Sequence, residues 1–477
     1  MAHRVVITGL GPVTSAGIGK EDFCRQIWTQ RCHLRPIPAS FTRTYPLRSR
    51  WYVPLPEVSL ASHGILLPHE DIMQAADRMA VLGVKLALED AGFAPVNTKG
   101  SAGFAGGANQ VLAGSPRRGD SGRLGEPSLP PMEIAFSKPE LRPFAGVEEA
   151  GLVLGASLGS MQAALESHLC HCLPREALQA ALPERRLAFS RMVVPKTMPN
   201  SPAAWASICF GLSGPCHTVN ASCASGTYAI GEAFRRIKDG YALMALAGGV
   251  ESFQDPDGFL MRGFDVLGVL TQSADGLPRP FGRNRSGFLF AEGGACLLVL
   301  EELEHAMRRG ARVYAEVADF QANSDASNIV QIDSTGKQIT RLLGQLSGGR
   351  RIDYLNAHGA GTVANDQVET RAIQAVFGGR ERQPLVNSTK GILGHTLGAS
   401  GAIEAAVTAL SIAGGTVHGN LTEHPMEDLN LPLENVTRPI VNAISVSYGF
   451  GGHNGGLLLT RYEPSRQERE RPASRPT

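Results

Sequence analysis

Short apolar runs alternate with longer stretches of helical periodicity along most of this chain. The short runs predict buried strands at residues 5–8, 151–154, 242–247, 295–300, 313–320, 354–356 and 443–447. The longer stretches predict helices, among them residues 75–91, 222–238, 368–377 and 398–413. Because strands and helices alternate, the pattern predicts an α/β fold.

Two halves of the chain show a loose internal similarity. Each half has a strand that ends in a Gly-rich turn, followed by a helix that opens with small residues. Residues 155–159 match residues 358–362 in this way, and residues 223–226 match residues 398–401. The similarity indicates a repeat but does not by itself establish a fold.

Two segments lack the periodic pattern. Residues 97–149 hold many Gly, Pro, Ser and Arg residues, and we expect them to form a surface insertion. Residues 465–477 are charged, contain Pro and have no apolar anchors, so we expect a disordered tail.

Composition narrows the class of protein. A chain of 477 residues with 43% hydrophobic and 19% charged residues is typical of a soluble globular protein. A net charge of +1 gives no reason to expect nucleic acid or bulk membrane as a partner. No unbroken run approaches about 18 apolar residues, so we expect no membrane span. The N-terminus reads as a buried strand and turn, and eight Cys without repeating spacing make no disulfide framework. We therefore expect a reducing, cytoplasmic location.

Cys223 is the strongest candidate for chemistry. It lies among small residues, within residues 218–228, and directly precedes an apolar helical pattern. At the start of a helix, partial positive charge and free N–H groups favour a thiolate, which suits a nucleophile for acyl transfer. The alternative is a structural Cys packed among small neighbours.

Two histidines have unusual settings. His358 lies at the end of an apolar strand, and His395 lies within residues 387–398. Gly359 follows His358 and Gly394 precedes His395. A neighbouring Gly allows a sharp turn and the close approach of a substrate. Strand ends are where open α/β sheets bind ligands, although a lone buried His is commonly a hydrogen-bonded core residue.

These residues, in this order, resemble the β-ketoacyl-acyl carrier protein synthases of the long-chain type II kind, which have the thiolase fold. The resemblance covers nearly the whole chain. It includes residues 4–11, 248–251, 279–281, 287–288, 292–295, 298–302, 304–306, 308–311 and 448–454. It implies two similar halves in a five-layered α-β-α-β-α arrangement, with the nucleophile in residues 1–255 and the two histidines in residues 256–462.

The resemblance also implies roles for individual residues. Cys223 takes the acyl chain from a carrier protein thioester, and its N–H and that of Phe450 form an oxyanion hole. His358 and His395 assist the decarboxylation of malonyl-carrier protein, because two N–H donors at the thioester oxygen stabilise an enolate. Lys390 and Glu369 form an ion pair behind the histidines. Phe450 acts as a gate, and Leu158 and Phe264 line the acyl tunnel.

The implied activity is a decarboxylating Claisen condensation in fatty acid or polyketide synthesis. Substrates arrive on the phosphopantetheine arm of acyl carrier protein, and neither a cofactor nor a metal is expected. The implied partners are the carrier protein and a second copy of the chain, or else a chain-length factor in a heterodimer. We expect the acidic carrier to dock on the basic residues ahead of the nucleophile, which are Arg185, Arg186, Arg191 and Lys196.

The chain departs from the family pattern near the first histidine. The family usually has Thr-Ser-Thr there to bind pantetheine, whereas this chain has Ala360, Gly361 and Thr362. His453 stands where Thr is common. These departures suggest a specialised synthase, and they leave open a non-catalytic partner subunit that resembles a chain-length factor.

Two other interpretations are weaker. A thiolase would carry a second active Cys near the C-terminus, but no Cys follows Cys296. The cluster of His and Cys at residues 168–172 has no second ligand pair at zinc-site spacing, so a loop or subunit contact is the better interpretation.

Overall fold

The computed structural model describes residues 2–43, 45–67, 70–95, 144–185, 187–426 and 428–463. Most of the expected insertion at 97–149, up to residue 143, lies outside the described residues, and so does the expected tail at 465–477.

The first half of the chain forms five strands in the order β6-β5-β7-β8-β1. β5 pairs in parallel with β6 and β7, and β8 pairs antiparallel with β7 and β1. The bounds are β1 (Val5–Thr14), β5 (Gly151–Gly155), β6 (Cys216–Val219), β7 (Met244–Ser252) and β8 (Gly293–Glu302).

The second half repeats this arrangement. Its order is β11-β10-β14-β15-β9, with β10 parallel to β11 and β14, and β15 antiparallel to β14 and β9. The bounds are β9 (Ala315–Ser324), β10 (Tyr354–Asn356), β11 (Leu385–Asn387), β14 (Asn442–Gly449) and β15 (His453–Thr460). The repeat indicated by the sequence is therefore present in the topology.

The boundary between the halves differs from the one expected at 255/256. β8 pairs with β1 and β7, so it completes the first sheet, and the second half begins only with β9. Three register pairs between β1 and β9, starting at Val5 and Val317, join the two sheets into one.

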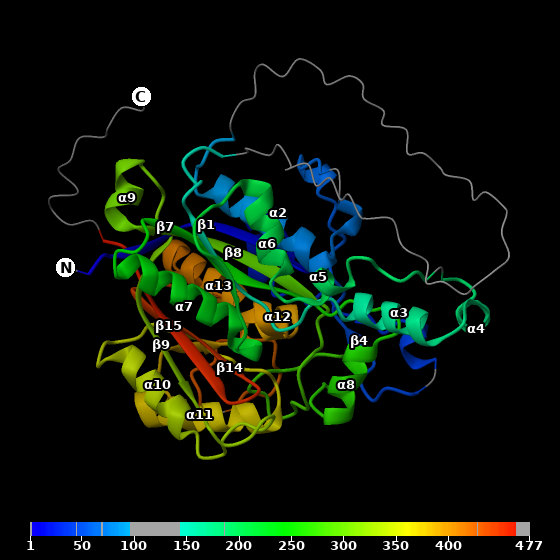
Figure 1. Ribbon diagram of the computed structural model, residues 1–477. Helices are drawn as coiled ribbons and strands as arrows, with labels where there is room; N and C mark the ends of the chain where they lie inside the picture. Colours follow the sequence, from blue (N-terminus) through cyan, green and yellow to red (C-terminus); the bar gives the residue numbers. More distant parts are fainter. Residues whose placement is uncertain are drawn as a thin grey trace.

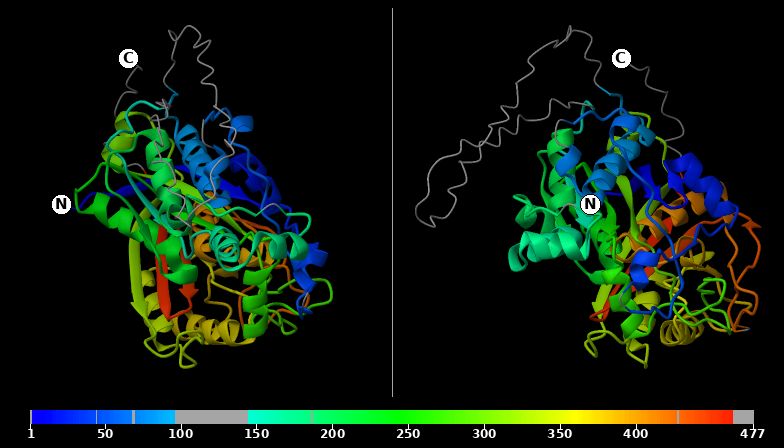
Figure 2. Two further views of the ribbon diagram at one scale, coloured as in Figure 1. Left: turned by 45° about the vertical axis from the view of Figure 1, so that its right-hand side comes forward. Right: turned by 90° about the vertical axis from the view of Figure 1, so that its right-hand side faces the viewer.

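Helices and sheets stack in five layers (Figures 1 and 2). α7 (Ser225–Lys238) and α13 (Ser400–Gly414) lie between the sheets and contact strands of both halves. α2 (Ala75–Asp90) and α6 (Ser201–Phe210) cover the first sheet, and α10 (Lys337–Ser347) and α11 (Val363–Phe377) cover the second. The expected five-layered fold is confirmed.

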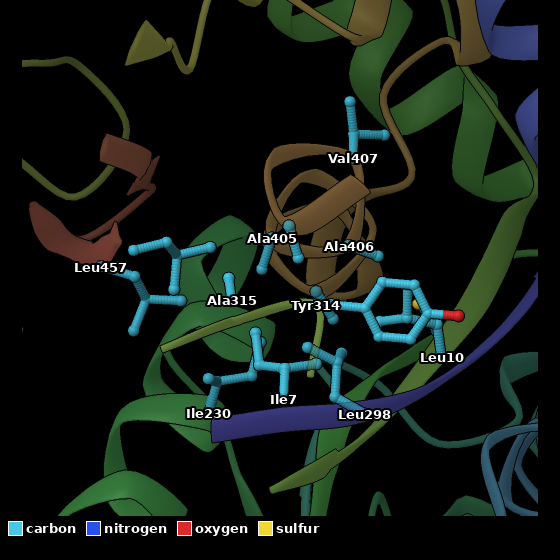
Figure 3. Packing of buried hydrophobic residues seen from close by; sticks show 14 of the residues in the cluster. Ile7, Leu10, Ile230, Leu298, Tyr314, Ala315, Ala405, Ala406, Val407 and Leu457 are labelled. Carbon is cyan, nitrogen blue, oxygen red and sulfur yellow. The ribbon is translucent and has the colours of Figure 1, made fainter. Parts of the chain in front are cut away.

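The largest buried cluster of side chains fills this middle layer. Figure 3 shows Ala405 and Ala406 of α13 near Ile7 of β1 and Ile230 of α7. The segment Leu397–Gly414 has the length and apolar composition of a membrane span, but 89% of it is buried, as in a core helix. Small residues bring α7 and α13 together, since a Cβ on Gly226 would lie 2.7 Å from the backbone N of Ala402.

The remaining elements surround this framework. The other helices are α1 (Lys20–Trp28), α3 (Met161–Cys172), α4 (Arg175–Ala181), α5 (Val193–Thr197), α8 (Phe259–Leu267), α9 (Leu303–Arg308) and α12 (Lys390–Leu393). The short strands are β2 (Gly17–Ile18), β3 (Arg35–Pro36), β4 (Trp51–Tyr52), β12 (Thr416–Val417) and β13 (Val436–Thr437).

Candidate active site

Cys223 lies at a sharp turn between β6 and α7. Ser222 has φ of +53°, a left-handed conformation that non-glycine residues rarely adopt and that is often found at functional sites. The Ser225 hydroxyl holds the turn, because it accepts the N–H of Ala221 (2.9 Å) and donates to the carbonyl of Ser222 (2.6 Å). Cys223 is 5% exposed at the start of the helix, as expected for a nucleophile that meets only a bound substrate.

The expected lowering of the thiol pKa is wrong for this resting state. Burial raises the pKa of Cys223 above its usual value. The Ser222 hydroxyl, the Lys390 charge and the Phe450 N–H all lower that pKa, but burial is the largest effect. Cys223 is therefore a neutral thiol before substrate arrives.

His358 follows β10 and is buried. Its backbone N–H donates to Glu369 (2.8 Å), and its carbonyl accepts from the ammonium of Lys390 (2.7 Å). Its Nδ1 accepts the backbone N–H of Tyr448 (3.3 Å), so the neutral ring carries its proton on Nε2.

His395 follows α12 in the same half and is oriented in a similar way. Its Nδ1 accepts the backbone N–H of Leu397 (3.2 Å) and lies 3.0 Å from the hydroxyl of Ser400. Its ring packs edge-on against Phe288, with ring centroids 5.0 Å apart. A neutral His395 therefore also carries its proton on Nε2.

The two imidazole rings form a pair of hydrogen-bond donors. Their centroids lie 5.5 Å apart, and the ring planes are nearly perpendicular. Burial and the Lys390 charge lower the pKa of both histidines well below the usual value. Both rings are therefore neutral at pH 7, and each offers one Nε2–H. This is the arrangement that stabilises negative charge on a substrate oxygen.

Lys390 does not pair with Glu369 as expected. Its ammonium contacts the carboxylate of Glu404 on α13, and both side chains are 2% exposed. Glu369 instead accepts the N–H groups of His358 and Gly359, both at 2.8 Å, and so holds the turn after β10. Burial raises the pKa of Glu369 and of Glu404 to about 7, against the effect of the nearby Lys390 charge.

This ion pair leads to a prediction on stability. Lys390→Met should lower the free energy of unfolding by about 3–5 kcal/mol, because it leaves Glu404 buried without its partner. The double variant Lys390→Met/Glu404→Leu should regain much of that loss, since it removes both charges. Urea unfolding measures both. Equal stability of the single and double variants would contradict this role of the pair.

An apolar cluster surrounds Cys223 on the substrate side. Phe264 packs against Phe253, Phe288 and Phe290, with ring centroids 5.6–6.1 Å apart. Leu158 is more exposed and lines a separate pocket together with Leu260. The buried members of the cluster are Phe41, Tyr52, Cys223, Phe253, Met261, Leu270, Phe288, Phe290, Ala360 and Leu397. The cluster can accommodate an acyl chain next to the nucleophile.

The segment after His358 has structural roles of its own. The Thr362 hydroxyl caps α11 by accepting the N–H of Asn365 (3.3 Å). Gly361 has φ of +82°, and a Cβ there would lie 2.7 Å from the carbonyl of Pro278. The backbone thus favours Gly at a position where the family has a hydroxyl, and pantetheine binding by Thr362 stays a prediction.

The four basic residues expected to dock a carrier are in different environments. Arg185 binds Glu166 (2.8 Å) and Asp257 (2.7 Å), and Arg186 lies outside the described residues. Arg191 is exposed, whereas Lys196 lines the same pocket as Leu158.

The cluster at 168–172 shows one internal contact. The Cys172 sulfur lies 3.6 Å from Nδ1 of His168, one turn away on α3. Among the described residues, no group of three or more His, Cys, Asp or Glu side chains is placed to hold a metal ion.

Two carboxylates and one hydroxyl at the site were not predicted from the sequence. Glu404 holds Lys390, Ser400 contacts His395, and Glu251 accepts the N–H groups of Ser157 (3.0 Å) and Gly398 (3.3 Å). Glu404 had a signal in the sequence, because it is an isolated charge in an otherwise apolar helix.

The chain matches two family models and a family of curated proteins. Residues 138–306 match the beta-ketoacyl synthase N-terminal domain, and residues 314–423 match the beta-ketoacyl synthase C-terminal domain. The chain is 36% identical over 329 residues to a mitochondrial 3-oxoacyl-[acyl-carrier-protein] synthase of Arabidopsis thaliana, covering 65% of this chain and 68% of that one.

Two further similarities extend the comparison. A putative polyketide beta-ketoacyl synthase 1 of Streptomyces cyaneus is 36% identical over 294 residues, covering 59% of this chain and 67% of that one. The solved ishigamide ketosynthase/chain length factor has a similar fold, with a TM-score of 0.75 and 24% identity, over 97% of this chain and all of that one.

Proposed function

Since the chain belongs to the β-ketoacyl synthase family and is a condensing enzyme of fatty acid or polyketide synthesis, we propose that Cys223, His358 and His395 carry its reaction. The single observation that supports this most strongly is the pair of neutral histidines that both present Nε2–H. The pair belongs to the second half of the fold, and the nucleophile belongs to the first.

Acyl transfer to Cys223 is the first step. The Cys223 sulfur attacks the thioester carbonyl and forms the new C–S bond, while the bond to the carrier sulfur breaks. The proton of the neutral Cys223 thiol leaves with the carrier thiol, so the exchange needs no external base overall. The N–H groups of Cys223 and Phe450 would stabilise the tetrahedral oxyanion.

Decarboxylation and condensation follow. The malonyl C–C bond breaks to release CO2, and the two Nε2–H groups stabilise the enolate oxygen. The enolate carbon attacks the acyl-Cys223 carbonyl, the C–S bond breaks, and the thiolate takes up one proton. Each step is redox neutral, so we propose that the enzyme needs no cofactor or metal. Eight free thiols support a reducing cytoplasm as its location.

A direct assay tests this function. The chain is incubated with an acyl carrier protein thioester and then with malonyl-carrier protein. Mass spectrometry should find the acyl group on Cys223 and a β-ketoacyl product afterwards. A non-catalytic partner subunit would give neither signal. The feature that favours this alternative is the absence of pantetheine-binding hydroxyls at Ala360 and Gly361.

A two-fold dimer is the expected assembly. β6 is the edge strand of the first sheet, and Cys216 and His217 on it are exposed. An exposed edge invites pairing with a second strand, and C2 homodimers are the commonest symmetric assemblies. Light scattering of the chain alone should give twice the chain mass. A monomer would contradict the homodimer, and a dimer formed only on addition of a chain-length factor would indicate the heterodimer.

Carrier docking is proposed at the basic residues ahead of the nucleophile. Arg186→Glu and Arg191→Glu should raise KM for carrier-bound substrate severalfold, more strongly at low salt, because the carrier is acidic. A small pantetheine thioester should react as before. Arg185→Glu makes a poor test, since it also breaks two ion pairs. An equal defect with both substrates would contradict docking at this surface.

A further inference from the structure

A second pocket adjoins the apolar cluster of Cys223. It has a volume of about 180 Å³, and Leu260 both lines it and packs against that cluster. Leu158 lines it as well, and the preceding residue, Ser157, accepts a hydrogen bond from Asn220 in the nucleophile turn (2.9 Å). The pocket therefore borders both the apolar cluster, where we place the acyl chain, and the turn that carries Cys223.

The lining of this pocket is polar and charged, unlike a tunnel for a hydrocarbon. Three helices, α2, α3 and α6, begin at its wall, so their N-terminal partial positive charges meet there. Lys196 and Arg78 add positive charge, and Asp77 adds negative charge.

Asp77 and Arg78 are incompletely hydrogen-bonded. Asp77 is 1% exposed, and its side chain accepts the N–H of Gln74 through Oδ2 (2.8 Å). Its Oδ1 is buried without a hydrogen bond of ordinary geometry among the described residues, although the Ser201 hydroxyl is its neighbour. Burial raises the pKa of Asp77 to about 6, against the effects of the Gln74 N–H, the Ser201 hydroxyl and the Lys196 charge. The Nε of Arg78 is likewise buried without a described partner. Such groups are costly unless something binds them.

We propose that this pocket selects acyl chains whose far end carries a neutral group that both donates and accepts hydrogen bonds, such as a hydroxyl or a carboxamide. The donor would bind Oδ1 of Asp77, and the acceptor would bind Lys196 or Arg78. A methyl end leaves these groups unpaired. A carboxylate only accepts hydrogen bonds, so it cannot satisfy Asp77, and an ammonium only donates them, so it cannot satisfy Lys196 or Arg78. The proposal rests on the proposed acylation of Cys223.

The experiment compares pantetheine thioesters of matched length whose far end is methyl, hydroxyl, carboxylate or ammonium. Each is tested over a series of chain lengths. The second-order rate constant for acylation of Cys223 is measured by mass spectrometry on the full chain. At the best length, the hydroxyl probe should react about tenfold or more faster than the methyl probe, because only the hydroxyl satisfies the buried carboxylate.

Variants connect the selectivity to Asp77. Asp77→Leu should abolish or reverse the preference for hydroxyl, and Asp77→Asn, which keeps an acceptor oxygen, should retain part of it. Asp90→Asn is the matched control at the opposite end of α2, where the carboxylate contacts Tyr314 (3.0 Å), and it should leave the preference unchanged. Lys196→Met provides a second test of the pocket if Asp77→Leu fails to fold.

The outcomes separate this inference from the proposed function. If no probe acylates Cys223, the proposed function fails. If the probes acylate Cys223 with equal rates, or the methyl or a charged end is preferred, only the polar pocket is overturned.

Discussion

Cys223→Ala is expected to abolish acyl labelling and condensation altogether. The sulfur is the only group at this turn that can form the thioester, and its neighbours in the cluster are apolar side chains. Malonyl decarboxylation should persist in this variant, because the two histidines that stabilise the enolate remain in place. Intact-protein mass spectrometry and release of labelled CO2 measure the two steps separately.

Cys209→Ala is the matched control for this prediction. Cys209 is also a buried free thiol, but it lies on α6, in the cluster of buried side chains between α2, α6 and the first sheet. The substitution Cys209→Ala should leave both steps intact. Labelling that persists at another residue in Cys223→Ala would show that the nucleophile has been assigned wrongly.

His358→Ala and His395→Ala are each expected to slow malonyl decarboxylation by about 100- to 1,000-fold. Each removes one of two Nε2–H donors to the enolate oxygen, and loss of one such donor costs about 2.7–4 kcal/mol of transition-state stabilisation. Acylation of Cys223 should suffer less, since its oxyanion is stabilised by backbone N–H groups. Single-turnover assays of the two steps give the separate rate constants.

The chain offers two controls for the histidines. His395→Gln keeps an N–H donor near the same place and should recover part of the rate that His395→Ala loses. His171→Ala removes an exposed imidazole on α3 and should change neither step. Equal loss of acylation and decarboxylation in the alanine variants would contradict this division of roles.

Apolar composition explains why some elements could be predicted from the sequence. The strands around Val5 and Leu298 and the helix α13 are apolar along nearly their whole length, because they are buried on all sides. No strand was predicted at β15, which contains Gly455 and Gly456, because Gly is depleted in strands. The structure places both residues in a central strand. A Cβ on Gly455 would lie 2.9 Å from the ring of Tyr228, so packing against α7 accounts for the glycine.

The sequence by itself determined the α/β class and indicated the repeat, and it predicted the reactive residues Cys223, His358 and His395. It could do so because a Cys at a helix start and histidines next to Gly are local patterns, and His358 also lies at the end of a strand. Only the tertiary structure decided the partners and protonation of these residues. Glu404 lies on the buried helix α13 and Glu369 lies on the outer helix α11, and the fold places Glu404, not Glu369, against Lys390.

Burial explains the other differences. The helix start predicted a thiolate at Cys223, but burial raises the pKa of this thiol and exceeds the lowering by the Ser222 hydroxyl, the Lys390 charge and the Phe450 N–H. Asp77 on α2 and Lys196 on α5 lie far apart along the chain, and only the packing of these helices with α3 and α6 brings them to one pocket. Charge, hydrogen bonding and desolvation depend on distances in space, and those distances exist only once the two halves have packed against each other.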